Sequence, residues 1–66
     1  MSLRQKELTQ VVRCYSDLEL DIRQRRLRTQ TELLKAVSSR CSLYSAQIEV
    51  LERLQERGML TLLKRA

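Results

Sequence analysis

The amino-acid sequence predicts an all-α protein, and three observations support that prediction. The chain of 66 residues contains no proline and only one glycine, so it lacks the residues that most often form tight turns. Leucine, arginine, glutamine, glutamate, lysine and alanine, which are all good helix formers, dominate the composition. Apolar residues recur at spacings of three and four, as they do on one face of a helix.

Two series of apolar residues organise the chain. The intervals between successive residues of the second series are those of the first series in reverse order. The first series spans residues 8–22 and the second spans residues 37–51, so their midpoint lies at Thr29 and Gln30. Both series fall on one helical face, which we expect to be an interface. The expected interface residues are Leu8, Val11, Tyr15, Leu18, Ile22, Leu33, Val37, Cys41, Tyr44, Ile48, Leu51 and Leu62, with Tyr15, Tyr44, Ile48 and Leu51 as anchors.

The shared helical phase of the two series favours one long amphipathic helix over about residues 3–57. Acid-before-base pairs at i, i+4, such as Asp21 with Arg25, cross the middle of the chain and support a continuous helix. The large apolar side chains of such a helix need a partner surface, because their exposure to water is unfavourable. We therefore expect an antiparallel coiled coil in which mirrored residues form layers. The polar residues expected to fix its register are Arg26, Thr29 and Gln30.

The alternative fold is a two-helix antiparallel hairpin that turns near Thr29 and Gln30. Thr29 and Glu32 have the spacing of a capping box, which marks the start of a helix. Three serines within residues 38–42 are a weaker signal for a turn. The hairpin would form within one chain the same residue pairs that the coiled coil forms between two chains.

Gly58 is the strongest stop signal in the sequence. A glycine can adopt the left-handed backbone conformation that commonly ends a helix, and Met59 could then contact Leu54. We expect the helix to end beside Gly58 and residues 58–66 to form a short apolar tail. The whole chain is expected to be one helical association module.

The two cysteines occupy different positions relative to the apolar face, because Cys41 lies on that face and Cys14 lies away from it. Two cysteines are too few to hold a secreted mini-protein together, so we expect two reduced thiols in a cytoplasmic protein. No apolar run approaches the roughly 20 residues needed to cross a bilayer, and no signal peptide is recognisable.

Catalytic and metal-binding residues are not expected in this chain. It contains no histidine, and no serine or cysteine has a base and an orienting acid close in sequence. The spacing of the two cysteines matches no zinc-binding pattern. We therefore expect a non-enzymatic protein with no cofactor.

A basic patch lies at the centre of a chain whose net charge is +5. Its members are Arg23, Arg25, Arg26 and Arg28. Acidic residues are interleaved with basic ones elsewhere, which is typical of a solvated helix surface. An acidic protein surface is the next interpretation, and non-specific phosphate contact with a nucleic acid is the least favoured.

The pattern as a whole indicates a protein–protein interaction module, acting as a scaffold or adaptor in a larger assembly. Its expected partner is a second copy in an antiparallel homodimer or another amphipathic helical protein. The alternative is a small chaperone or adaptor that covers an apolar helix of a client. In size and in the two-helix layout, the chain is similar to the small co-chaperone subunits of bacterial type III secretion systems.

Overall fold

The computed structural model of the protein describes residues 3–63, and helices account for most of that range. The elements are α1 (Gln5–Arg23), α2 (Gln30–Arg40), α3 (Tyr44–Glu56) and a 3-10 helix, η1 (Met59–Leu62). The described residues contain no β-strand, which confirms the all-α prediction. Of the expected tail, residues 64–66 lie outside the described range.

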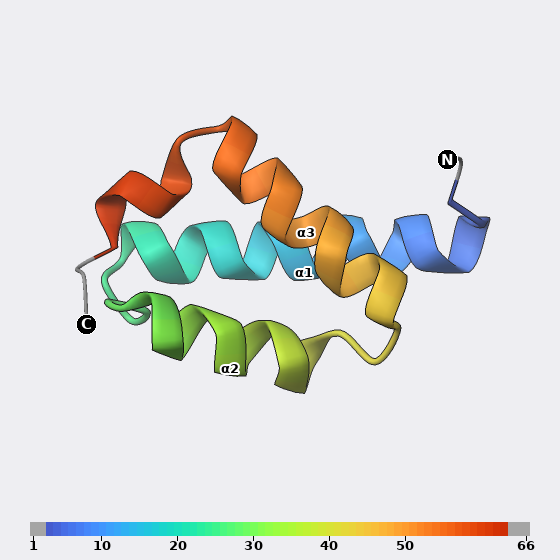
Figure 1. The fold of residues 1–66 in the computed structure, drawn as a ribbon, viewed down its shortest axis with the longest axis horizontal. Coiled ribbons are helices and arrows are strands. Elements are labelled where there is room, and N and C mark those ends of the chain that lie inside the picture. The colour runs from blue at the N-terminus through green and yellow to red at the C-terminus, as the bar shows by residue number, and fades with distance from the viewer. Residues whose placement is uncertain (1–2, 64–66) are drawn as a thin grey trace.

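The prediction of a single long helix is wrong, because the chain reverses direction twice. The first reversal lies at residues 24–29 and the second at residues 41–43. The hairpin alternative includes the first turn but not the second, so it describes only part of the fold. As a result α2 runs antiparallel to α1, and α3 runs in the same general direction as α1 (Figure 1).

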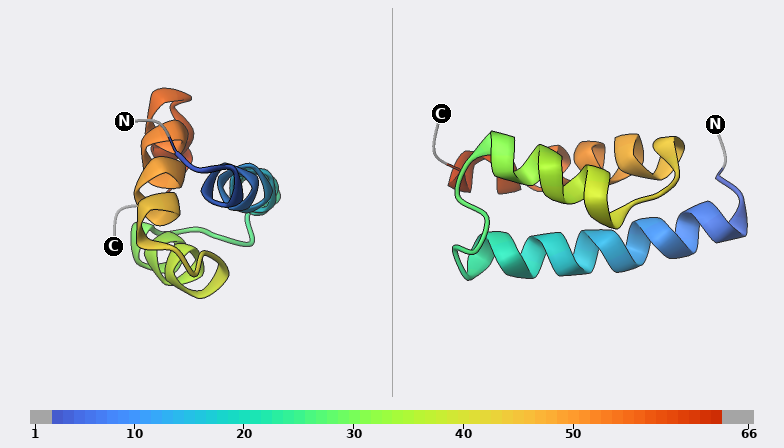
Figure 2. Two further views of the ribbon diagram at one scale, coloured as in Figure 1. Left: turned by 90° about the vertical axis from the view of Figure 1, so that its right-hand side faces the viewer. Right: turned by 90° about the horizontal axis from the view of Figure 1, so that it is seen from below.

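The helix α1 is the longest and is the element against which the others pack. Contacts between α1 and α3 are the most extensive, whereas α2 contacts both α1 and α3 more sparsely. Two further views of the ribbon place α2 and α3 on the same side of α1 (Figure 2). The described residues therefore form a small bundle whose second and third helices diverge from each other.

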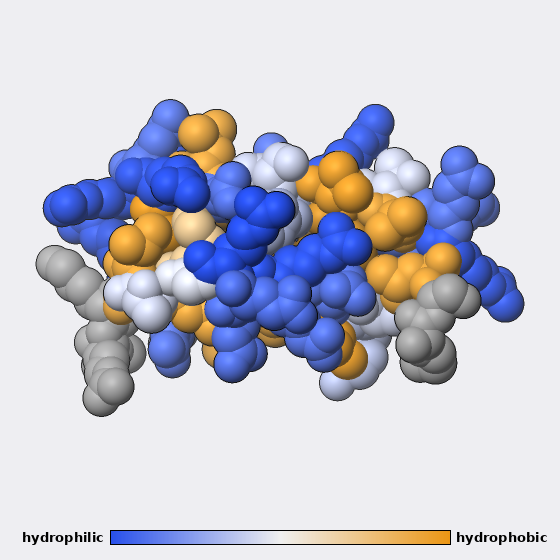
Figure 3. All heavy atoms as spheres, turned by 90° about the horizontal axis from the view of Figure 1, so that it is seen from above, coloured by the Kyte–Doolittle hydropathy of each residue, from blue (hydrophilic) through white to orange (hydrophobic). Residues whose placement is uncertain are grey.

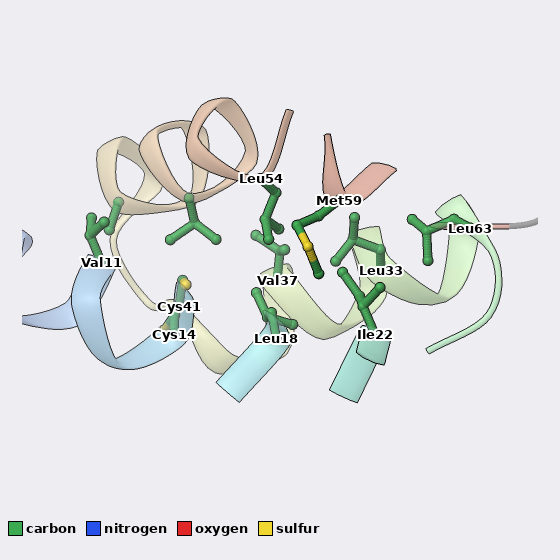
Figure 4. Close-up of a cluster of buried hydrophobic side chains, with 12 residues drawn as sticks. Val11, Cys14, Leu18, Ile22, Leu33, Val37, Cys41, Leu54, Met59 and Leu63 are labelled. Carbon is green, nitrogen blue, oxygen red and sulfur yellow. The ribbon is translucent and has the colours of Figure 1, made fainter. Parts of the chain in front are cut away.

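The buried core is built from one face of each helix and from η1. The face of α1 begins at Val11 and ends at Ile22, and the face of α3 consists of Ala46, Val50 and Leu54 at spacings of four. Residues from every element meet along the length of the bundle (Figure 4). The core residues are Val11, Cys14, Leu18, Ile22, Leu33, Val37, Cys41, Ala46, Val50, Leu54, Met59 and Leu63.

Backbone hydrogen bonds at the end of α1 define the first turn. The carbonyl of Asp21 accepts from the amides of Arg26 and Leu27, at 2.8 and 3.2 Å. Arg25 adopts a left-handed conformation with φ of 61°, which turns the chain away from the helix axis. The turn leads directly into the start of α2.

A capping box at the start of α2 confirms the expected signal at Thr29. The Thr29 hydroxyl accepts from the amide of Glu32 at 3.1 Å, and the Glu32 carboxylate accepts from the amide of Thr29 at 3.2 Å. Each bond satisfies an amide that the helix itself leaves without a partner.

The second turn is held by a side chain from α1. The Gln10 amide accepts from the backbone N–H of Leu43 at 3.0 Å and donates to the Ser42 hydroxyl at 2.9 Å. The Gln47 side chain closes the same turn by donating to the carbonyl of Cys41 at 2.7 Å. These contacts supply the partners that a turn without glycine or proline needs.

The acidic residues of α1 form ion pairs different from the expected ones. The Asp21 carboxylate contacts the Arg40 guanidinium at 2.7 Å and the Arg26 guanidinium at 3.8 Å, and it forms no ion pair with Arg25. Its side chain is only 12% exposed, so the contact with Arg40 compensates a carboxylate that lies close to the core. The pair links α1 to the end of α2.

Gly58 ends α3 as expected. Its φ is +70°, and its amide donates to the carbonyl of Gln55 at 3.0 Å. The turn returns the chain to the bundle, so Met59 joins Leu54 in the core.

Leu18→Ala is expected to lower the free energy of unfolding by about 2 to 5 kcal/mol, because it leaves a cavity at the centre of the bundle. Leu20→Ala on the same helix is the matched control, since Leu20 is 50% exposed and should contribute less than about 1 kcal/mol. Urea unfolding followed by circular dichroism measures both variants. Equal destabilisation by the two substitutions would contradict this bundle.

Candidate protein-binding groove

An open groove is lined by residues of α2, α3 and η1. It has a volume of about 330 Å³. Most of its lining is apolar, and η1 closes one end through Leu60. The lining residues are Gln30, Leu33, Leu34, Ile48, Leu51, Glu52, Gln55 and Leu60.

The apolar residues of the groove differ in how far they are exposed. Leu34 on α2 and Ile48 on α3 are 55% and 42% exposed, although both are large aliphatic side chains. Leu51 and Leu60 are half-buried between them, and Leu33 is buried in the core. The groove thus presents aliphatic side chains on both sides and at its base. Glu52 is the one charged residue in its lining.

A second hollow, of about 560 Å³, lies at the turn between α1 and α2. Its lining combines three arginines with three apolar residues, and these are Ile22, Arg23, Arg25, Leu27, Arg28 and Leu62. Within residues 3–63 none of these three arginines forms an ion pair. We call this hollow the arginine pocket.

The short helix η1 separates the groove from the arginine pocket. Leu60 lines the groove, and Leu62, two residues later, lines the arginine pocket and is 57% exposed. On the other side of the groove, Gln30 follows the arginine-bearing turn directly. An apolar surface and a positively charged one therefore meet at the same end of the bundle.

Exposed apolar side chains do not form a continuous strip on the upper face of the molecule. Seen from above, hydrophilic side chains run across the middle of the molecule, and apolar patches are separated by them (Figure 3). Another hollow near the start of α1 includes Tyr44, which is 75% exposed, and Leu43. Charged residues such as Lys6 and Glu7 border that hollow, so it is less apolar in its surroundings than the groove.

The structure divides the twelve predicted interface residues between the core and the surface. Tyr15 and Leu51 are half-buried. Those buried inside the chain are Val11, Leu18, Ile22, Leu33, Val37 and Cys41. Those exposed at the surface are Leu8, Tyr44, Ile48 and Leu62. Half of the predicted interface therefore packs within one chain, where a second chain has no access to it.

The mirrored pair of Tyr15 and Tyr44 does not form a layer within this chain. Tyr15 lies in a hollow with Arg53 and Arg57 near the end of α3, whereas Tyr44 lies at the start of α3 near Thr9. The two tyrosines are at opposite ends of α3 because α3 and α1 run in the same general direction. A mirror pairing requires them to run in opposite directions.

The three polar residues expected to fix a register have local roles instead. Thr29 caps α2, and Gln30 is the first residue of that helix and lines the groove. Arg26 is largely exposed and pairs with Asp21 within the same chain. None of these contacts involves a polar layer in the core.

The placement of Cys14 corrects the sequence interpretation. Cys14 is only 5% exposed and belongs to the core, although it was expected to lie away from the apolar face. The core of α3, formed by Ala46, Val50 and Leu54, was also absent from the predicted set. Its regular spacing of four was the available signal, but the spacing of Tyr44, Ile48 and Leu51 competed with it.

Two titratable side chains in or near the core have raised pKa values. Burial raises the pKa of the Cys41 thiol to about 12, and a hydrogen bond with the Cys14 side chain adds to the effect. Burial, together with the bond its hydroxyl donates to Glu19 at 2.8 Å, raises the pKa of Tyr15. Both groups are thus neutral at physiological pH.

Within residues 3–63 no group of three or more histidine, cysteine, aspartate or glutamate side chains is arranged to hold a metal ion. None of the helices in that range combines the length and the apolar character that crossing a lipid bilayer requires. Comparison with known proteins found no matching family model, no matching curated protein and no matching solved structure.

Stability should decrease at alkaline pH through Cys41. The unfolded thiol ionises near its ordinary value of 9.0, whereas the folded thiol stays protonated until about pH 12. The contribution of the Cys41 thiol to the free energy of unfolding is therefore complete below about pH 8. It is lost progressively as the pH rises toward the pKa of the folded thiol. The stability difference between the wild type and Cys41→Ala, measured by urea unfolding with reductant, should narrow from about pH 8 to about pH 11. A constant difference would contradict the burial of this thiol.

Proposed function

We propose that this chain is a non-enzymatic protein–protein interaction module that binds an amphipathic helix of another protein in the groove between α2 and α3. The observation that supports the proposal is the exposure of two large aliphatic side chains in the groove, Leu34 from α2 and Ile48 from α3. Leu51 and Leu60 complete a surface of leucine-sized side chains. Adaptors and small chaperones commonly offer such a surface to a single helix of a client.

The groove is suited to a helix because it is itself bounded by two diverging helices. A third helix laid between them would place side chains at i, i+3, i+4 and i+7 against Leu34, Ile48 and Leu51. Glutamine side chains at the rim, from Gln30 and Gln55, could bond to polar flanks of that helix. Transfer of these aliphatic surfaces out of water would supply the main driving force.

The charge of the chain favours an acidic partner over a second copy. Each copy carries a net charge of +5, so two copies repel each other. The arginine pocket beside η1 offers the guanidinium groups of Arg23, Arg25 and Arg28, none of which has an acidic partner within residues 3–63. An amphipathic helix with carboxylates at one end would place them there while its apolar face fills the groove.

Self-association through the predicted mirrored face is no longer the favoured mechanism. Val11, Leu18 and Ile22 are already buried by α2 and α3, so a second chain could reach them only after the bundle opens. The adaptor or chaperone function needs no such opening. The remaining exposed residues, Ile48 among them, are available in the folded chain.

A designed peptide tests this proposal on the full chain. The probe is a fluorescently labelled amphipathic helix of about 18 residues, or five turns, with leucines on one face and glutamates at one end. Binding measured by anisotropy should weaken at least tenfold in Ile48→Asp, because a charge replaces an aliphatic contact. Leu20→Asp is the matched control: Leu20 is similarly exposed but lines none of the described hollows, so this variant should bind as the wild type does.

Two further measurements separate the alternatives. A peptide of the same composition in scrambled order should bind much more weakly, and equal binding would contradict a helix-in-groove mode. Salt-sensitive binding of an arbitrary DNA duplex that is lost in Arg25→Glu, without any peptide binding, would replace the proposal by nucleic-acid contact. Circular dichroism of Ile48→Asp should match the wild type, since Ile48 lies outside the core.

A further inference from the structure

The two cysteines of the chain meet in the core although 26 residues separate them in sequence. Cys14 lies in the middle of α1, and Cys41 is the residue at which α2 ends. Both are buried, and the exposed fraction of Cys41 is 0%. Both belong to the core cluster, and in the close-up of the core their side chains overlap in projection between Val11 and Leu18 (Figure 4).

A hydrogen bond holds the Cys14 thiol beside the backbone of Cys41. The Cys14 thiol donates to the carbonyl of Arg40, the residue before Cys41, at 3.3 Å. The Cys14 side chain also contributes to the raised pKa of the Cys41 thiol, which is consistent with two side chains that lie close together. The Cys14 thiol therefore lies against the peptide bond that joins Arg40 to Cys41. Both thiols are free in this structure.

The backbone on both sides of the pair is held in place by contacts other than those of the sulfurs. Gln10, one turn before Cys14, binds the backbone of Leu43, and Gln47 binds the carbonyl of Cys41. Asp21 and Arg40 pair on the other side. These contacts fix α1 against the second turn, so the cysteines stay together without a covalent bond.

We propose that Cys14 and Cys41 form an intramolecular disulfide when the protein meets a small disulfide oxidant such as glutathione disulfide. The bond would join the middle of α1 to the turn between α2 and α3. It would close a loop that contains the first turn and all of α2.

The reaction proceeds by two thiol–disulfide exchanges. One cysteine loses its proton to solvent, and its thiolate attacks a sulfur of glutathione disulfide, which releases one glutathione thiolate. The second cysteine then loses its proton and attacks the protein sulfur of the mixed disulfide, which releases the second glutathione thiolate. The protein loses two protons and two electrons, and glutathione disulfide takes them up to give two molecules of glutathione.

The environment of Cys41 determines when the reaction can occur. Its raised pKa keeps the thiol protonated near neutral pH, and its burial keeps the oxidant away. The closed bundle is therefore slow to react, and oxidation depends on transient opening of α2 or α3 from α1. Once formed, the disulfide prevents the same opening. The disulfide would thus persist after the chain has been exposed to an oxidising environment.

The test is oxidation of the full wild-type chain in a glutathione redox buffer, both in its native state and during refolding from urea. We expect a mass decrease of about 2 Da with no glutathione adduct and no change in elution volume. Trypsin cleaves after Arg13 and Arg40, so the oxidised protein should yield the peptides 14–23 and 41–53 joined by one disulfide. Tm should rise by roughly 10 °C while the helical circular dichroism is retained.

Cys14→Ser and Cys41→Ser are the matched controls, and each should show neither the mass decrease nor the rise in Tm. Two free thiols after refolding in oxidising buffer would overturn the proposal. Interchain dimers as the main product, or loss of helical structure on formation of the bond, would overturn it as well. Because no peptide partner takes part, these results are independent of whether the groove binds a helix.

Discussion

The fold depends on covering the buried face of α1 with both of the other helices. Val11, Leu18 and Ile22 extend over most of the length of α1, and all three are buried. The chain therefore passes along α1 twice, once in each direction (Figure 1). A chain of 66 residues buries little apolar surface on folding, so its stability depends on burying this face within one chain.

The same constraint explains why a groove remains open. The contacts of α2 with α1 and with α3 are both limited, and Leu34 on α2 and Ile48 on α3 remain exposed. Gln10 and Asp21 hold α2 and its turn against α1 at two separate points, which limits how far the helices can close over the gap. The groove thus remains where α2, α3 and η1 leave apolar side chains exposed.

Much of the local structure could be predicted from the sequence, but the association of the helices could not. The capping box at Thr29 and the stop at Gly58 are local signals, and both are present in the structure. The second turn has no glycine or proline, and it is stabilised by Gln10, which is more than thirty residues away in sequence. Such a contact leaves no local pattern. The sequence of α3 also carries two apolar faces, and the one that includes Ile48 matches the spacing of the first series. The structure buries the other face, which includes Val50.

The most direct test of this account is the radius of gyration in solution, measured by small-angle X-ray scattering. The bundle has a Cα radius of gyration of 11.2 Å, close to the value of about 11 Å expected for a folded chain of this length. A single helix over residues 3–57 would be a rod about 80 Å long, with a radius of gyration above about 20 Å. A value near that of the bundle, with the mass of one chain, is the result that this account predicts. A rod-like particle with the mass of two chains would contradict it.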